Sequence, residues 1–167
     1  GLDLGTSELK ALLMGSDGAV LATAHAPLQW RQPQPGWAEQ DAQDWWLAAM
    51  AACAQLKHSA PDALAAVRAI GLSGQMHGAT LLDAHDEVLR PCMLWNDTRS
   101  AAQCEALTRD VPRLHEIAGN LAMPGFTAPK LAWVREHEPD VFARVASVLL
   151  PKDWLRFKLT GRTVSEM

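Results

Sequence analysis

A carboxylate and a Gly-Thr-Ser turn stand near the start of the chain, in residues 3–7, which read Asp-Leu-Gly-Thr-Ser. The backbone N–H groups and two hydroxyls of such a turn can bind phosphate oxygens, and the carboxylate of Asp3 can hold Mg²⁺ through water. The run is not a Walker A loop, because the chain contains no G-x-x-x-x-G-K-[ST] pattern. These residues predict a phosphate-binding turn. A plain β-turn closed by an Asx bond is the alternative.

Two glycines flank three functional side chains in residues 74–78, which read Gly-Gln-Met-His-Gly. Glycine lets a ligand approach the backbone closely, and Gln75 and His77 carry amide and imidazole groups that can hydrogen-bond sugar hydroxyls. We expect these side chains, with Met76 between them, to point into a cleft. For His77 the alternative is a structural histidine that binds no ligand.

Trp95, Asn96 and Asp97 form the next candidate group, within residues 94–99 (Leu-Trp-Asn-Asp-Thr-Arg). An indole can lie against the apolar face of a sugar, with the amide and the carboxylate beside it. The alternative is that Asp97 caps a helix that begins near Thr98.

The elements expected to position these residues begin with a β-meander. Residues 9–14 and 19–24 predict two strands, joined by a Ser-Asp-Gly turn at 16–18. A short buried strand is predicted at 67–72, directly before the Gly-Gln-Met-His-Gly segment. Further along the chain we expect a hairpin over 79–89 and a strand at 147–150.

Helices are expected between and after these strands. Asp41 is a suitable N-cap for a helix running to about Leu56, whose apolar residues recur at helical spacing. In residues 123–133, Thr127 can cap a helix that places Trp133 in the core. Hairpins followed by helices that alternate with single strands indicate a mixed α/β domain.

The composition excludes several classes of protein. The 167 residues are 49% hydrophobic and 20% charged, which excludes intrinsic disorder, and no stretch approaches the ~18 uninterrupted apolar residues of a transmembrane helix. Fifteen Lys and Arg against nineteen Asp and Glu give a formal charge of −4, so we expect no nucleic-acid partner. The three cysteines show no C-x-x-C spacing, which predicts reduced thiols and a cytoplasmic location.

The order and spacing of these motifs resemble the FGGY family of carbohydrate kinases. The stretches that carry the resemblance are 1–7, 74–78, 94–99, 119–139 and 149–161. Within the family, Gln-Met-His at 75–77 is similar to the branch that phosphorylates D-xylulose, whereas glycerol kinases carry Gln-Arg-Glu there. The resemblance covers the whole chain.

The resemblance implies an actin-like, ribonuclease-H-like α/β fold, with a mixed sheet flanked by helices. Two such domains would close on nucleotide and sugar, and residues 1–167 would form most of the N-terminal domain. The C-terminal domain, the adenosine-binding loops and the aspartate that acts as catalytic base would lie on later segments, beyond Met167. The chain begins inside a predicted strand without an initiator Met, so we expect a fragment. Because it would lack the base and the second domain, we expect this fragment to be inactive alone.

Each candidate residue receives a role from the same resemblance. Asp3 matches the aspartate associated with Mg²⁺, and Met76 and His77 match the pair that contacts the ketose. The positions near the nucleotide phosphates are Thr6, Ser7 and Lys10. The remaining candidates for the sugar pocket are Gln75, Trp95, Asn96 and Asp97.

The implied reaction is transfer of the γ-phosphoryl group of ATP to D-xylulose, giving D-xylulose 5-phosphate, with Mg²⁺ neutralising charge. The implied ligands are D-xylulose and MgATP, without a membrane partner, and a homodimer is compatible with the sequence. One alternative is a kinase for another ketose or polyol of the same family. An Hsp70-like or actin-like ATPase is the other, since it shares the turn at 3–7, but it does not explain residues 75–77 or 94–99.

Overall fold

The computed structural model describes residues 1–165, and the chain divides into two units. The described residues of unit 1 are 1–30, 41–75 and 151–165, and those of unit 2 are 31–40 and 76–150. The boundary after Gln75 falls inside the Gly-Gln-Met-His-Gly segment, so the candidate residues are divided between the units. Met167, beyond which the catalytic base is expected, lies outside the described residues. The position of that base therefore stays a prediction.

Unit 1 contains a mixed sheet that has, within residues 1–165, four strands in the order β3-β2-β1-β5. The strands are β1 (Leu2–Leu4), β2 (Glu8–Met14), β3 (Val20–Pro27) and β5 (Leu72–Gly74). β1, β2 and β3 are antiparallel neighbours, whereas β5 runs parallel to β1 with Leu4 opposite Gly74. The meander predicted from residues 9–14 and 19–24 is confirmed.

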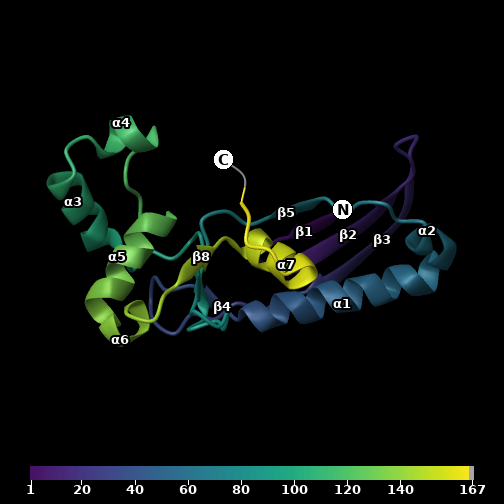
Figure 1. Ribbon diagram of the computed structural model, residues 1–167, viewed down its shortest axis with the longest axis horizontal. Helices are drawn as coiled ribbons and strands as arrows, with labels where there is room; N and C mark the ends of the chain where they lie inside the picture. Colours follow the sequence, from purple (N-terminus) through teal and green to yellow (C-terminus); the bar gives the residue numbers. More distant parts are fainter. Residues whose placement is uncertain (166–167) are drawn as a thin grey trace. The chain divides into compact units, whose positions relative to one another are not determined.

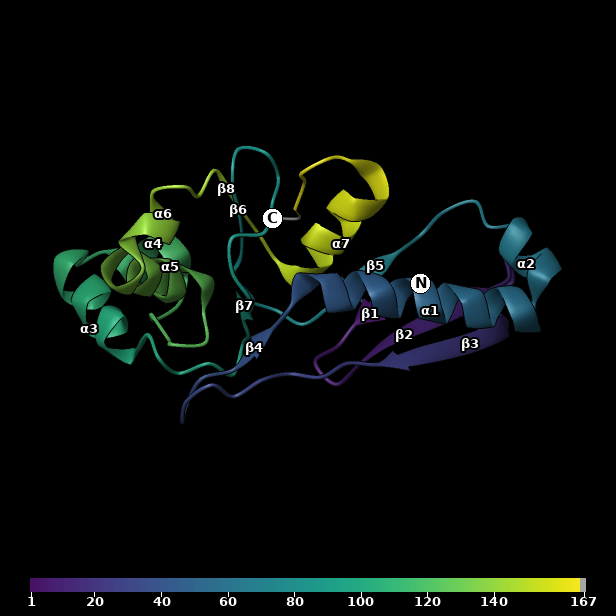
Figure 2. The same cartoon turned by 90° about the horizontal axis from the view of Figure 1, so that it is seen from below.

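One face of this sheet is buried by helices. Along β2, Leu9 and Ala11 are buried while Lys10 is exposed, because successive side chains of a strand point to opposite faces. Helix α1 (Ala42–Ser59) packs on β2 and β3 and runs along them in Figures 1 and 2. The predicted cap is confirmed, since the Asp41 carboxylate accepts a hydrogen bond of 2.9 Å from the N–H of Gln43.

Two further helices belong to unit 1, α2 (Pro61–Ala65) and α7 (Pro151–Thr160). The buried indole of Trp45 in α1 meets that of Trp154 in α7 edge to face, with ring centroids 5.9 Å apart. This packing joins α7 to α1 in the core of unit 1.

The strand predicted at 67–72 is wrong over most of its length. Val67 and Ile70 lie outside any strand and are 40% and 55% exposed. The strand begins only at Leu72, which pairs with Leu2. Because β1 has three residues, it offers main-chain partners for only a short parallel neighbour.

Unit 2 contains short helices and two small ribbons, joined by turns and loops. The ribbons pair β4 (Glu39–Gln40) with β7 (Cys92–Met93) and β6 (Thr80–Leu82) with β8 (Ser147–Leu149). The helices are α3 (Ala101–Asp110), α4 (Leu114–Ala118), α5 (Thr127–His137) and α6 (Pro139–Phe142). The core gathers Ala79, Leu81, Met93, Trp133 and Val134. The predicted strand at 147–150 is confirmed as β8. The predicted hairpin over 79–89 consists of β6 and a bridge from Leu82 to Val88.

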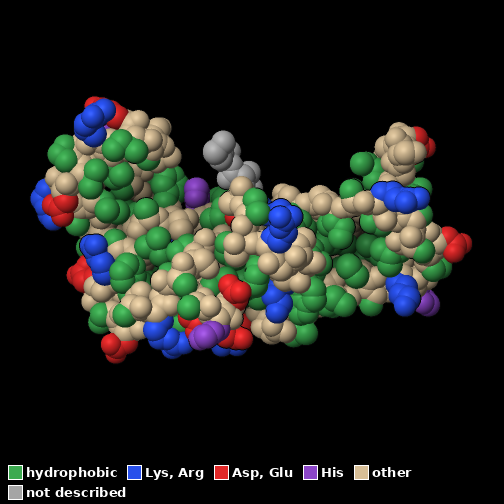
Figure 3. All heavy atoms as spheres, in the orientation of Figure 1, with side chains coloured by type: hydrophobic (Ala, Val, Ile, Leu, Met, Phe, Trp, Pro, Cys, Tyr) green, Lys and Arg blue, Asp and Glu red, His purple; other side chains and the backbone are tan. Residues whose placement is uncertain are grey.

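The surface carries charges of both signs, and acidic and basic side chains are interspersed on the face drawn in Figure 3. Hydrophobic side chains are exposed around α4, where Ile117 and Leu121 are 74% and 69% exposed. Within the part of the chain that the structure describes, no helix has both the length and the apolar character needed to cross a membrane.

Gly74→Ala should destabilise the protein. A Cβ at this position would lie 2.9 Å from the main-chain oxygen of Leu4 and 3.1 Å from its Cβ. Relieving these contacts would part β5 from β1, and overpacking of this kind costs roughly 1–3 kcal/mol. Gly71→Ala is the matched control, because a Cβ there has no atom within 4 Å. Thermal unfolding should show a lower Tm for Gly74→Ala alone, and equal Tm values for the two variants would contradict this packing.

Candidate functional site

The turn between β1 and β2 is fixed by main-chain hydrogen bonds. The N–H of Gly5 donates to the oxygen of Glu8 at 3.1 Å, and the N–H of Gln75 donates to the oxygen of Leu4 at 2.8 Å. A Cβ on Gly5 would lie 2.9 Å from the oxygen of Glu8. The tight closure of this turn therefore requires a glycine.

The side chain of Gln75 lies against the same turn. It is 6% exposed, and its Oε1 accepts a hydrogen bond of 3.3 Å from the hydroxyl of Thr6. Its Nε2 donates to the oxygen of Gly5 at 3.5 Å. The structure thus brings Gln75 to the predicted phosphate turn, where Ser7 is exposed beside Thr6. Sugar binding by Gln75 stays a prediction.

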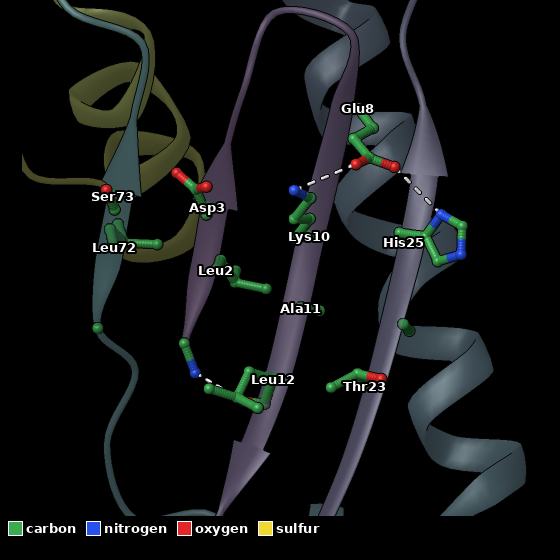
Figure 4. A pocket seen from close by; sticks show the side chains of 13 residues that line it. Leu2, Asp3, Glu8, Lys10, Ala11, Leu12, Thr23, His25, Leu72 and Ser73 are labelled. Carbon is green, nitrogen blue, oxygen red and sulfur yellow. Dashed lines mark hydrogen bonds and ion pairs between the residues drawn. The ribbon is translucent and has the colours of Figure 1, made fainter. Parts of the chain in front are cut away.

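Asp3 and Lys10 lie side by side on the sheet face opposite α1, as Figure 4 shows. They are register partners on adjacent strands, and Ser73 pairs with Asp3 from the other side. The three residues line a hollow of about 680 Å³. The Nζ of Lys10 lies 3.3 Å from the carboxylate of Glu8, which also lies 3.2 Å from Nδ1 of His25 (Figure 4). A phosphate that binds Lys10 would compete with Glu8 for its ammonium.

The donor set of unit 1 fits a magnesium ion that arrives with its nucleotide. Among residues 1–165, no group of three or more His, Cys, Asp or Glu side chains could hold a metal ion. Asp3 is exposed in the middle of β1, close to the hydroxyls of the turn in sequence. Mg²⁺ usually keeps several waters and binds through one or two carboxylates and the phosphates of its substrate. A single exposed carboxylate therefore suits Mg²⁺ bound through water.

In unit 2, His77 has an unusual backbone conformation. Its φ is 62°, in the left-handed region that residues other than glycine rarely adopt. Its ring lies against that of Phe126, with centroids 4.4 Å apart, and the preceding Met76 is 54% exposed. Burial lowers the pKa of His77, and the Lys130 ammonium lowers it further. A neutral imidazole offers one donor and one acceptor, which suits sugar hydroxyls.

Lys130 is a candidate that sequence reasoning missed. Its side chain is fully buried, and Nζ donates to the main-chain oxygens of His77 at 2.8 Å and Gly125 at 2.7 Å. Burial lowers the pKa of Lys130 to about 8. The available signal was its spacing, because Lys130 stands three and four residues before Trp133 and Val134, on the buried face of α5. Lysine is rarely buried without polar partners, so the burial of Lys130 must be explained by the hydrogen bonds that it makes.

Trp95 and Asn96 are exposed at the start of a turn, whereas Asp97 is fully buried. The Asp97 carboxylate accepts from the N–H of Ala38 at 2.7 Å and from Nη2 of Arg99 at 2.6 Å. Trp95 and Asn96 are thus placed where a ligand could reach them. The oxygens of Asp97 are engaged inside unit 2, and its contact with a sugar stays a prediction.

The two helix caps suggested for this unit are wrong. α3 begins at Ala101 and has Ser100 at its N-cap, so Asp97 lies outside the capping position and bonds the N–H of Arg99 instead. α5 begins at Thr127 itself, and the Thr127 hydroxyl donates to the oxygen of His77 at 3.2 Å. In place of the suggested caps, Thr127 bonds a residue distant in sequence, and Asp97 bonds both the nearby Arg99 and the distant Ala38.

A charged network surrounds Asp97. The guanidinium of Arg99 lies 3.6 Å from the ring centroid of Trp37, and its Nη2 lies 2.8 Å from the Glu39 carboxylate. Arg90 also pairs with Glu39, at 2.7 Å. These pairs are almost completely buried. Their geometry fixes the loop from which Trp95 and Asn96 project.

Comparisons with known proteins agree on one family. The family model described as "FGGY family of carbohydrate kinases, N-terminal domain" matches residues 1–167. The chain is 50% identical to the xylulose kinase of Escherichia coli (strain K12) over 169 residues, which cover 100% of this chain and 34% of that protein. The Klebsiella pneumoniae xylulose kinase is 51% identical, with 100% and 34% covered. The chain therefore spans about a third of the length of these curated relatives.

Solved structures agree with this result. A xyloylose kinase from Brucella ovis gives a TM-score of 0.94 at 54% identity, covering 96% of this chain and 34% of that one. The xylulose kinase from Rhodospirillum rubrum gives 0.90 at 34% identity, covering 98% and 35%. The expected ribonuclease-H-like, actin-like α/β fold, with a mixed sheet flanked by helices, is confirmed.

Asp97→Asn should destabilise the protein strongly. The amide would place N–H groups against the Arg99 guanidinium and the Ala38 N–H, and removing one partner of a buried ion pair costs about 3–5 kcal/mol. Asp110→Asn is the matched control, because Asp110 pairs with Arg109 in the open, where side chains are 61% and 71% exposed. Chemical denaturation should show a large loss for Asp97→Asn and almost none for Asp110→Asn. A loss of sugar binding at unchanged stability would instead make Asp97 a direct ligand.

Proposed function

The chain belongs to the FGGY family of carbohydrate kinases, and on this premise we propose that the protein containing it phosphorylates D-xylulose with ATP. The product is D-xylulose 5-phosphate. The observation that carries the proposal is the identity of 50% and 51% to two xylulose kinases over the whole chain. An Hsp70-like or actin-like ATPase would share the fold without this likeness.

The turn of unit 1 receives the phosphates of ATP in this proposal. Its main-chain N–H groups and the hydroxyls of Thr6 and Ser7 can bind phosphate oxygens. Mg²⁺, when bound to the nucleotide, neutralises charge on the transferred phosphoryl group. Asp3 would hold that ion through water, and the ammonium of Lys10, which pairs with Glu8 in this structure, would bind a phosphate instead.

The loops of unit 2 bind the sugar in this proposal. The imidazole of His77 hydrogen-bonds a sugar hydroxyl, Met76 contacts the ketose largely through its backbone, and the indole of Trp95 forms a wall with Asn96. Asp97 contributes by anchoring the turn that carries Trp95 and Asn96, since its carboxylate bonds Ala38 and Arg99. Exposure of Met76 and Trp95, at 54% and 46%, supports a surface open to ligand.

The proton of the attacking hydroxyl needs a general base. We assign this base to an aspartate beyond Met167, in the remaining two thirds of the length that the relatives have. Phosphoryl transfer depends mainly on positioning and on electrostatic stabilisation, so residues 1–167 alone should not turn over. We place the enzyme in the cytoplasm, in keeping with free thiols at Cys53, Cys92 and Cys104. A homodimer is compatible with this proposal.

A substrate panel tests the proposed function. The full-length protein, assayed for ADP release with MgATP, should turn over D-xylulose faster than other ketoses, aldoses and glycerol. The reason is the Gln-Met-His segment at 75–77, where glycerol kinases carry Gln-Arg-Glu. Faster turnover of glycerol, or ATP hydrolysis that no sugar stimulates, would overturn the assignment.

Asp3→Ala in the full-length protein should lower kcat by roughly 100-fold or more, because the lost interaction stabilises charge mainly in the transition state. KM for D-xylulose should change little, since the proposal assigns Asp3 to the ion on the phosphates and not to the sugar. Asp62→Ala, another exposed carboxylate of unit 1, is the control and should leave kcat unchanged. A near-normal kcat in Asp3→Ala would contradict a role in catalysis and favour the alternative, a plain β-turn without a phosphate-binding function.

A further inference from the structure

Lys130 is buried at the junction of two loops of unit 2. Its Nζ bonds the main-chain oxygen of His77, in the segment after β5, and that of Gly125, in the loop before α5. The two oxygens lie at 2.8 and 2.7 Å, short distances that are typical of hydrogen bonds from a charged donor. One amine therefore ties two loops that are about fifty residues apart in sequence.

The residue that Lys130 holds is strained. His77 has φ of 62°, a conformation that is unfavourable for a residue other than glycine, so surrounding contacts must enforce it. Two side-chain donors converge on its carbonyl, Nζ of Lys130 at 2.8 Å and the hydroxyl of Thr127 at 3.2 Å. While these donors hold the backbone of His77, the ring of Phe126 packs against its imidazole, with ring centroids 4.4 Å apart.

The second bond of Lys130 reaches the loop beside Trp95. A Cβ added to Gly125 would clash with the main-chain oxygen of Trp95, so the two segments are in close contact. By holding the oxygen of Gly125, Lys130 also fixes the backbone against which Trp95 lies. Of the two segments that the proposed function assigns to the sugar, Lys130 thus bonds one directly, at His77, and supports the other through Gly125.

We propose that Lys130 is a positioning residue for the sugar: together with Thr127 it holds the backbone of His77 so that the imidazole is presented to a ketose hydroxyl. The inference rests on the proposed function above. Lys130 acts through main-chain oxygens and does not itself contact the ligand. Its removal should change recognition of the sugar, with little effect on the nucleotide, which the proposal assigns to the turn of unit 1.

The decisive experiment is a double-mutant cycle in the full-length protein. Lys130→Met should lower kcat/KM for D-xylulose by about 10- to 100-fold, as small misplacements in a site do, while KM for ATP at saturating sugar changes less than about two-fold. In the His77→Ala background the same substitution should have a much smaller effect, because residues that act as one unit are not additive. Arg135→Met removes an exposed cation from the same helix and should leave all constants unchanged.

Thr127→Val provides a second and milder variant. It removes one donor from the oxygen of His77 with little change in shape, and it should lower kcat/KM for the sugar a few-fold. This variant decides the matter if Lys130→Met does not fold. An undiminished effect of either substitution in the His77→Ala background, or equal losses for sugar and ATP, would show a merely structural role and overturn the inference.

An activity-independent measurement separates this inference from the proposed function. In protein labelled with ¹³C-histidine, the His77 signal is identified by its absence from His77→Ala. The ring of Phe126 should shift this signal in the wild type, and Lys130→Met should move it towards the position of an exposed histidine. An unmoved signal would overturn the positioning role. Failure of the wild type to phosphorylate D-xylulose would overturn only the proposed function.

Discussion

Main-chain groups in the irregular segments of the candidate site must find hydrogen-bond partners, because a buried polar group without one costs about 1–3 kcal/mol. Side chains from distant parts of the chain supply these partners. The amide of Gln75 donates a hydrogen bond to the main-chain oxygen of Gly5 in the turn of unit 1. In unit 2, Lys130 donates to the carbonyls of His77 and Gly125. The residues predicted to bind ligands are thus held by buried neighbours.

Buried charges in unit 2 are stabilised in two different ways. Arg99 meets the carboxylates of Asp97 and Glu39 and lies over the ring of Trp37, so its charge is paired and also faces an aromatic ring. Lys130 bonds neutral carbonyls, and burial lowers its pKa to about 8. A lysine that bonds carbonyls needs only its donors, so it can hold a loop even when neutral.

The two faces of the sheet in unit 1 carry different kinds of residue: core residues on one face and candidate ligands on the other. The face of β2 that carries Leu9 and Ala11 is buried under α1, whereas Asp3 and Lys10 stand on the opposite face. Strand alternation alone makes this division. A single strand can therefore supply core residues to one side and candidate phosphate ligands to the other.

The sequence by itself determined the features that depend on local interactions. The meander, the helix capped by Asp41 and the turn after Asp3 follow from side-chain alternation, capping and turn chemistry among near neighbours. The motifs at 74–78 and 94–99 also indicated the family from sequence. These features need no knowledge of which distant segments meet.

Only the tertiary structure decided which of these residues are exposed and which are buried and hold the others. The start of β5 at Leu72, the bonds of Asp97 inside unit 2 and the role of Lys130 all depend on partners far away in the chain, such as Leu2 for β5 and His77 for Lys130. The physical reason is that a buried polar group takes the partner that the fold brings within about 3 Å, and sequence spacing does not determine that partner.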